Sequence, residues 1–178
     1  MRLDLGAGIR REAGYVSVDV AASLEPDVVW DLERFPWPWD DASATEVRML
    51  HVLEHLGQDP KVFLRIMGEV NRVLAPGGLF RVHVPHPRSD TYLGNYQHVR
   101  PVTQLMLQQF SRKHGFSPEI YSETGIDLEI VEVTNEPFPE WSRAVVEGRL
   151  TVVDLERAMH EQFNVVNEIR ILMKKVVV

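Results

Sequence analysis

The sequence predicts an α/β fold with a mostly parallel β-sheet. Short apolar segments suited to strands recur along the chain, and segments with helical periodicity lie between several of them. Strands that alternate with helices are typical of crossover units, which join parallel strands. The length of 178 residues and the hydrophobic content of 44% suffice for one domain with a sizeable core. We therefore expect a single domain over residues 1–178.

Strands are expected in the first part of the chain at residues 2–5, 15–20, 27–30 and 45–50. The connection between the first two is too short for a full helix. Pro36 and Pro38 cannot take part in regular strand pairing, so residues 32–43 are expected to form a loop.

The clearest helix begins at Asp59-Pro60, which supply a helix cap and a first-turn proline. Apolar residues then recur on one face as far as Leu74. Pro76-Gly77-Gly78 is expected to form the turn that ends this helix, and residues 79–84 are expected to form the fifth strand.

The second half contains two further helices and two further strands. Thr103 can cap a helix that ends near His114-Gly115, and Thr151 with Asp154 resembles a capping box before another helix. The intervening segment 88–101 has no periodicity. The last two strands, at 127–133 and 168–178, are expected to pair with one of them reversed.

Polar and glycine residues follow the first three strands in a recurring order. Gly6-Ala7-Gly8 follows the first strand, where residues without side chains allow a ligand to approach the backbone. Asp19 ends the second strand, and Asp31-Leu32 follows the third. The missing third glycine and the short spacing to Asp19 argue against a nicotinamide dinucleotide site, for which about 20 residues would be expected.

With these motifs the chain resembles the class I S-adenosylmethionine-dependent methyltransferases, particularly the methyltransferase-11-like group. The resemblance covers residues 2–86 and is carried by the segments DLGAG, SVDV, DLERFPWPWDD, HVLEHL and NRVLAPGGLFRVHVP in that order. It implies a Rossmann-like, mostly parallel seven-stranded sheet with flanking helices, shortened at the N-terminus. It also implies S-adenosylmethionine as the cofactor.

The resemblance assigns roles to individual residues. Asp4, Gly6, Ala7 and Gly8 are expected around the methionyl end of the cofactor, and Asp19 at the ribose hydroxyls, since a carboxylate can accept two hydrogen bonds from a diol. Asp31 and Leu32 are expected at the adenine, and His51 beside the sulfonium. The alternative is that the aspartates only cap turns.

Three histidines are candidate bases for methyl transfer, because each can titrate near neutral pH: His51, His86 and His98. His51 also begins an H-x-x-E-H pattern that matches an inverted zinc-peptidase signature, which we keep as a remote alternative. Some quinone-type O-methyltransferases bind a divalent cation through E-x-x-E-H at this place. We expect no metal site here, because the full carboxylate set is not visible, and we expect His55 to cap or pack locally.

The function predicted from the sequence is methyl transfer to oxygen or nitrogen of a small-molecule or glycan-type acceptor. A catalytically silent S-adenosylmethionine-binding partner subunit is the alternative. The net charge of −7 disfavours nucleic acid as a partner, and no apolar stretch approaches the roughly 20 residues that span a membrane. The absence of cysteine suits a cytoplasmic location. The site is expected to be open, and to be covered by a homodimer partner, another subunit or residues 88–101.

Overall fold

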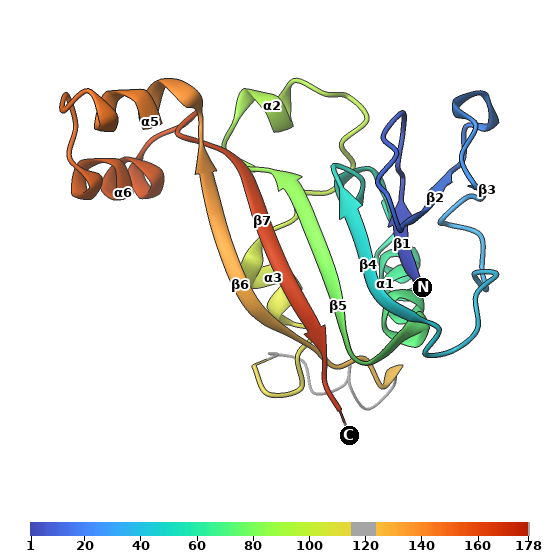
Figure 1. Cartoon of the computed structure of the whole chain (residues 1–178). Helices are drawn as coiled ribbons and strands as arrows, with labels where there is room; N and C mark the ends of the chain where they lie inside the picture. Colours follow the sequence, from blue (N-terminus) through green and yellow to red (C-terminus); the bar gives the residue numbers. More distant parts are fainter. Residues whose placement is uncertain (115–123, 178) are drawn as a thin grey trace.

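One mixed β-sheet organises the molecule. The computed structural model describes residues 1–114 and 124–177, and within these ranges seven strands form a sheet of order β3-β2-β1-β4-β5-β7-β6 (Figure 1). The strands are β1 (Arg2–Leu5), β2 (Val16–Asp19), β3 (Val28–Val29), β4 (Ala44–Leu50), β5 (Leu74–Pro85), β6 (Leu128–Pro137) and β7 (Val166–Lys175). β7 runs antiparallel to β5 and β6, and the other pairs are parallel. The expected fold class is confirmed.

The helical elements are short except for α1. They are the 3-10 turns η1 (Ala22–Leu24) and η2 (Leu53–His55), and the helices α1 (Pro60–Val73), α2 (Asp90–Leu93), α3 (Gln104–Gln108), α5 (Pro139–Val146) and α6 (Val152–Glu161). Asp59 caps α1 as expected, by accepting a hydrogen bond from the Lys61 N–H at 2.8 Å. The capping box of α6 is also confirmed.

Two expectations about element boundaries are wrong, and one helix was not expected. The turn expected at Pro76-Gly77-Gly78 lies inside β5, since Leu74 and Leu79 on either side of it both pair with β4; Gly77 has a φ of +76° at the register shift between these pairs. The helix capped by Thr103 ends at Gln108, well before the expected end, and Gly115 lies outside the described residues. Helix α5 was not expected at all.

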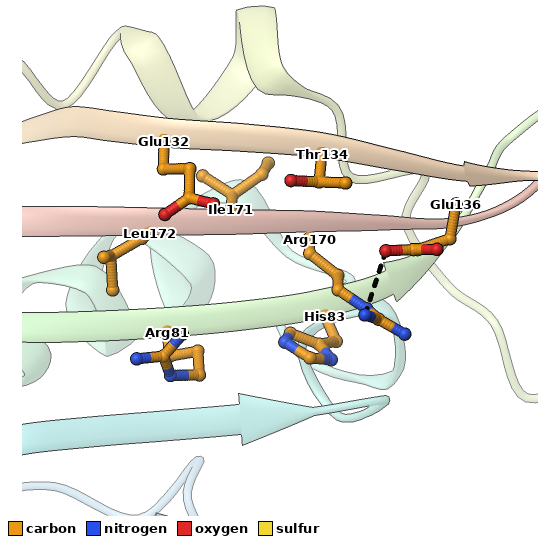
Figure 2. A pocket seen from close by; sticks show the side chains of 8 residues that line it. All are labelled: Arg81, His83, Glu132, Thr134, Glu136, Arg170, Ile171 and Leu172. Carbon is orange, nitrogen blue, oxygen red and sulfur yellow. Dashed lines mark ion pairs between the residues drawn. The ribbon is translucent and has the colours of Figure 1, made fainter.

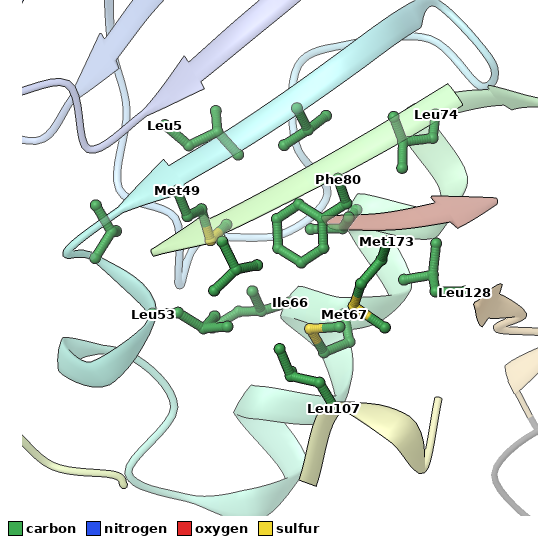
Figure 3. Packing of buried hydrophobic residues seen from close by; sticks show 14 of the residues in the cluster. Leu5, Met49, Leu53, Ile66, Met67, Leu74, Phe80, Leu107, Leu128 and Met173 are labelled. Carbon is green, nitrogen blue, oxygen red and sulfur yellow. The ribbon is translucent and has the colours of Figure 1, made fainter. Parts of the chain in front are cut away.

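The hydrophobic core lies between the sheet and α1, with α3 beside it (Figure 3). Leu5, Met49 and Phe80 project from β1, β4 and β5 towards Ile66 and Met67 of α1, and all of these side chains are at most 1% exposed. The predicted helical spacing from residue 62 onward therefore identified the buried face of α1 correctly.

The opposite face of the sheet is polar. In Figure 1, α1 and α3 lie behind the sheet, and none of the described helices covers the face towards the viewer. Because side chains alternate along a strand, Leu3 and Leu5 enter the core while Asp4 points to this open face. There Asp4 pairs with Arg48 of β4, with 2.7 Å between Oδ2 and Nη2. Within the described ranges, no helix is both long and apolar enough to cross a membrane.

Candidate functional site

Several of the predicted site residues lie at one edge of the sheet. β1, β2, β4 and β5 are parallel, so the segments that follow them emerge on the same side. Gly6 follows β1, Asp19 ends β2, and His51 follows β4. The strand order reverses at β1, which lies between β2 and β4. Open α/β sheets bind ligands beside the carboxyl ends of strands at such a reversal.

The glycine turn wraps around the end of β2. The N–H groups of Gly6 and Ala7 both donate to the Val18 carbonyl, at 2.8 and 3.0 Å. Gly6 has a φ of +68°, and a Cβ there would lie only 2.4 Å from Cγ2 of Val52. Gly8 also has a positive φ, of +60°, but a Cβ on it would meet nothing within 4 Å. Gly6 is therefore required by packing, whereas Gly8 faces open space.

Asp19 connects β2 to the glycine turn. Its Oδ2 accepts a hydrogen bond from the Gly8 N–H at 2.9 Å, and its Oδ1 accepts one from the Ala21 N–H at 2.9 Å. The side chain is half-buried, and each carboxylate oxygen can accept a further hydrogen bond. The structure thus brings Asp19 and Gly8 together, as the sequence prediction requires.

Asp31 and Leu32 follow β3 and have different surroundings. Asp31 is exposed, and its Oδ1 accepts a hydrogen bond from the Glu33 N–H at 2.9 Å, which is a turn-capping contact. Leu32 is only 6% exposed and belongs to the hydrophobic core. Its carbonyl accepts a hydrogen bond from Nε1 of Trp37 at 3.0 Å. The Leu32 side chain therefore has a packing role in the hydrophobic core.

His51 forms an ion pair that was not predicted from the sequence. Its Nε2 lies 2.5 Å from Oε2 of Glu168 in β7, and its Nδ1 lies 3.7 Å from Oε1 of Glu54. The hydrogen bond to Glu168 and the Glu54 carboxylate raise the pKa of His51 to about 9. Burial would raise the pKa of Glu168, but hydrogen bonds from His51 and Arg170 lower it to about 2. At neutral pH His51 is therefore protonated, which suits a hydrogen-bond donor better than a base.

Glu168 contacts His83 and Arg170, which line a polar pocket on the open sheet face (Figure 2). Its Oε1 lies 3.6 Å from Nδ1 of His83 and 2.5 Å from Nε of Arg170. Arg170 also pairs with Glu136 at 2.9 Å. The pocket has a volume of about 370 Å³ and carries both signs of charge along β5, β6 and β7. In the sequence, the alternation of Glu168 and Arg170 with isoleucines was the available signal for an outward-facing charged pair.

The other two candidate histidines lie in different surroundings. His86 follows β5 and lines a separate pocket with residues of α3, and its Nδ1 accepts a hydrogen bond from the Arg88 N–H at 3.1 Å. Burial, with a smaller contribution from Arg88, lowers the pKa of His86. His98 packs against His55, with 4.8 Å between the ring centroids.

The H-x-x-E-H pattern is not helical. His51 has a φ of +60°, and only Leu53–His55 form a single 3-10 turn. His51 and His55 therefore do not share a helix face, and the setting that the zinc-peptidase signature needs is missing from this part of the structure.

No family model matches the chain, and no curated protein matches it. Solved structures do match. A SAM-dependent methyltransferase from Archaeoglobus fulgidus is 18% identical, with a TM-score of 0.63 over 98% of this chain and 85% of that one. The methyltransferase in complex with the Trm112 activator from Haloferax volcanii is 17% identical, with a TM-score of 0.58 over 99% and 82%.

A third match is the 1,6-didemethyltoxoflavin-N1-methyltransferase from Burkholderia thailandensis, whose structure contains S-adenosylhomocysteine. It is 13% identical, with a TM-score of 0.57 over 99% of this chain and 71% of that one. Identities this low establish the fold alone. The chain therefore has the fold of the class I S-adenosylmethionine-dependent methyltransferases, as the sequence motifs implied.

Proposed function

We propose that the protein is an S-adenosylmethionine-dependent methyltransferase that binds its cofactor at the carboxyl ends of β1, β2 and β3. One observation carries the proposal: Asp19 holds the Gly8 N–H at the edge where the strand order reverses, and the space beside Gly8 is open. An anionic carboxylate beside a side-chain-free turn fits a ligand that carries a ribose diol.

The proposed contacts follow the edge of the sheet. Asp19 binds the ribose hydroxyls, and the turn formed by Gly6, Ala7 and Gly8, with Asp4 beneath it, surrounds the methionyl end. Asp4 is 1% exposed, and its Oδ1 has no hydrogen-bond partner among the described residues. The Asp31 carboxylate and the Leu32 backbone contact the adenine edge.

When bound, S-adenosylmethionine would supply a sulfonium methyl group to an oxygen or nitrogen of the acceptor, with the thioether S-adenosylhomocysteine as the leaving group. The protein's task is then to align the acceptor and to exclude water. His51 lies at the carboxyl end of β4 as an imidazolium held by Glu168, and it donates a hydrogen bond to the acceptor. Burial and Arg88 lower the pKa of His86, but its only lone pair, on Nδ1, accepts the Arg88 N–H, so His86 can take the proton that the acceptor loses only when that hydrogen bond opens.

The acceptor that we propose is a polar small molecule or glycan. The pocket next to Glu168 supports this class because arginines and glutamates line it together. We further propose that a second copy of the chain or another subunit covers the open edge; one matching structure is a methyltransferase in complex with an activator. A silent subunit is not favoured, since the matched structures include several described as methyltransferases.

The activity test is a transfer assay with methyl-labelled S-adenosylmethionine and a panel of hydroxyl and amine acceptors. We expect label in an acceptor with the wild-type protein and reduced turnover with His51→Ala, while affinity for S-adenosylhomocysteine changes little. If His51→Ala instead lowered the affinity for S-adenosylhomocysteine and left turnover unchanged, His51 would be a cofactor-binding residue and would not take part in methyl transfer. Failure to bind either form of the cofactor would contradict the proposal.

A further inference from the structure

Three potential metal ligands converge at the end of η2. Glu54 and His55 belong to η2, and His98 comes from the segment after α2. One ligand atom from each of the three lies within 4.8 Å of the others. This grouping was not expected from the sequence, because His98 is distant along the chain and lies in a segment without periodicity.

The Glu54 carboxylate is buried without a hydrogen bond from any described residue. The residue is 1% exposed, and neither carboxylate oxygen has a hydrogen-bond partner within the described part of the chain. The ring of His51 lies 3.7 Å from Oε1, which is beyond hydrogen-bonding distance. Burying a carboxylate without hydrogen bonds is costly, and coordination to a cation would offset that cost.

Both histidines are oriented with one nitrogen available. Nδ1 of His55 lies 3.2 Å from the Gln97 carbonyl, and Nδ1 of His98 lies 2.7 Å from the Tyr92 carbonyl. A carbonyl can only accept, so both Nδ1 atoms carry a proton and the Nε2 atoms of the neutral rings keep a lone pair. Metal-binding histidines are typically held in this way, with the second nitrogen donating to a carbonyl or carboxylate.

Backbone hydrogen bonds connect η2 to the segment that contains His98. The N–H groups of Val99 and Arg100 both donate to the Glu54 carbonyl, at 2.9 and 3.2 Å. The His98 ring stacks on Tyr92, with 5.1 Å between centroids and an interplanar angle of 24°. The ligand atoms are therefore close together before any ion binds, which reduces the entropy cost of binding.

We propose that Glu54, His55 and His98 bind a divalent transition-metal ion of the Zn²⁺ class. Zn²⁺ and Fe²⁺ both bind to sites made of two imidazoles and one carboxylate. Three protein ligands leave further coordination positions of the ion open. Mg²⁺ prefers oxygen ligands and is excluded by this set. The Asn95 amide nitrogen now lies 3.2 Å from Nε2 of His98, and the ion replaces that contact. The site does not depend on the proposed methyl transfer.

The test is a calorimetric titration of chelator-treated protein with Zn²⁺, with Co²⁺ absorption spectra as a second readout. We expect one ion per chain. His98→Ala should weaken binding at least about 100-fold, since even the partners that orient metal ligands are worth about 10–100-fold. His160→Ala, which removes an exposed histidine of α6, should leave the affinity unchanged. Mg²⁺ should give no heat of binding.

A second measurement separates metal binding from misfolding. Zn²⁺ should raise the melting temperature of the wild-type protein and of His160→Ala, but not that of His98→Ala, whose circular dichroism spectrum should match the wild type. The proposal is overturned if the wild-type protein does not bind Zn²⁺. It is equally overturned if His55→Ala and His98→Ala both bind Zn²⁺ as tightly as the wild type.

Discussion

At the scale of single residues, the two glycines of the turn after β1 have different reasons to be glycine. Gly6 combines a positive φ with a contact that leaves no room for a Cβ beside Val52, whereas Gly8 has a positive φ and open space. The sequence alone does not distinguish the two glycines. It shows that both positions lack a side chain, but not which atoms a side chain at each position would contact. Only the packing of Val52 distinguishes a structural glycine from one that faces a ligand.

Gly6→Ala should therefore destabilise the fold more than Gly8→Ala. A left-handed backbone costs a residue with a Cβ about 1–2 kcal/mol, and overpacking adds about 1–3 kcal/mol at Gly6. Urea unfolding of both variants measures the difference. Val52→Ala should recover part of the loss when it is combined with Gly6→Ala, and simple additivity in this double-mutant cycle would contradict the clash.

The ion pairs of Glu168 with His51 and Arg170 make the stability of the fold depend on pH in the acidic range. The pKa of Glu168 is about 2 in the folded protein against 4.5 in the unfolded chain, so its contribution is complete above about pH 4.5 and is lost as the pH falls towards 2. Glu168→Gln should cost on the order of 1–3 kcal/mol at pH 6, and the difference from the wild type should shrink towards pH 3.

Denaturant unfolding at several pH values checks this prediction, and Glu136→Gln is a matched control. Glu136 also pairs with Arg170, but its side chain is 36% exposed, so its removal should have a small effect. A Glu168→Gln effect that stays constant from pH 6 to pH 3 would show that the carboxylate is not held ionised by His51 and Arg170.

At the scale of elements, α1 was predictable because local signals and packing agree. The Asp59 cap, the first-turn proline and the apolar spacing all indicate the helix that the structure contains. β5 and α3 were not bounded correctly because their ends depend on partners far along the chain. β5 extends through Gly77 by pairing with β4, and just beyond the end of α3 the Phe110 carbonyl accepts a hydrogen bond from the Leu128 N–H.

Asp59→Ala should weaken α1 at its start. The carboxylate satisfies the Lys61 N–H, and removing such a cap typically costs about 1 kcal/mol. Thermal or urea unfolding gives the measurement, with the exposed Asp40→Ala as the control for loss of an aspartate. Equal stability of the two variants would show that the cap contributes nothing.

At the scale of the whole molecule, the sheet concentrates the candidate site at one edge and leaves one face polar. The order of motifs in the sequence was enough to predict the fold and the proximity of Gly8 and Asp19 at this edge of the sheet. It could not predict the pairing of His51 with Glu168, or of Asp4 with Arg48, because these contacts join strands that are distant in the chain. Strand register creates them, and no local pattern encodes that register.

The central claim is that S-adenosylmethionine binds beside Asp19, and calorimetric titration with S-adenosylhomocysteine tests it most directly. The wild-type protein and the exposed control Asp40→Ala should bind with the same affinity. Asp19→Ala should bind more weakly by about 1–3 kcal/mol, from the loss of charge-assisted hydrogen bonds to the ribose. No binding by the wild-type protein, or unchanged affinity in a correctly folded Asp19→Ala, would contradict the account.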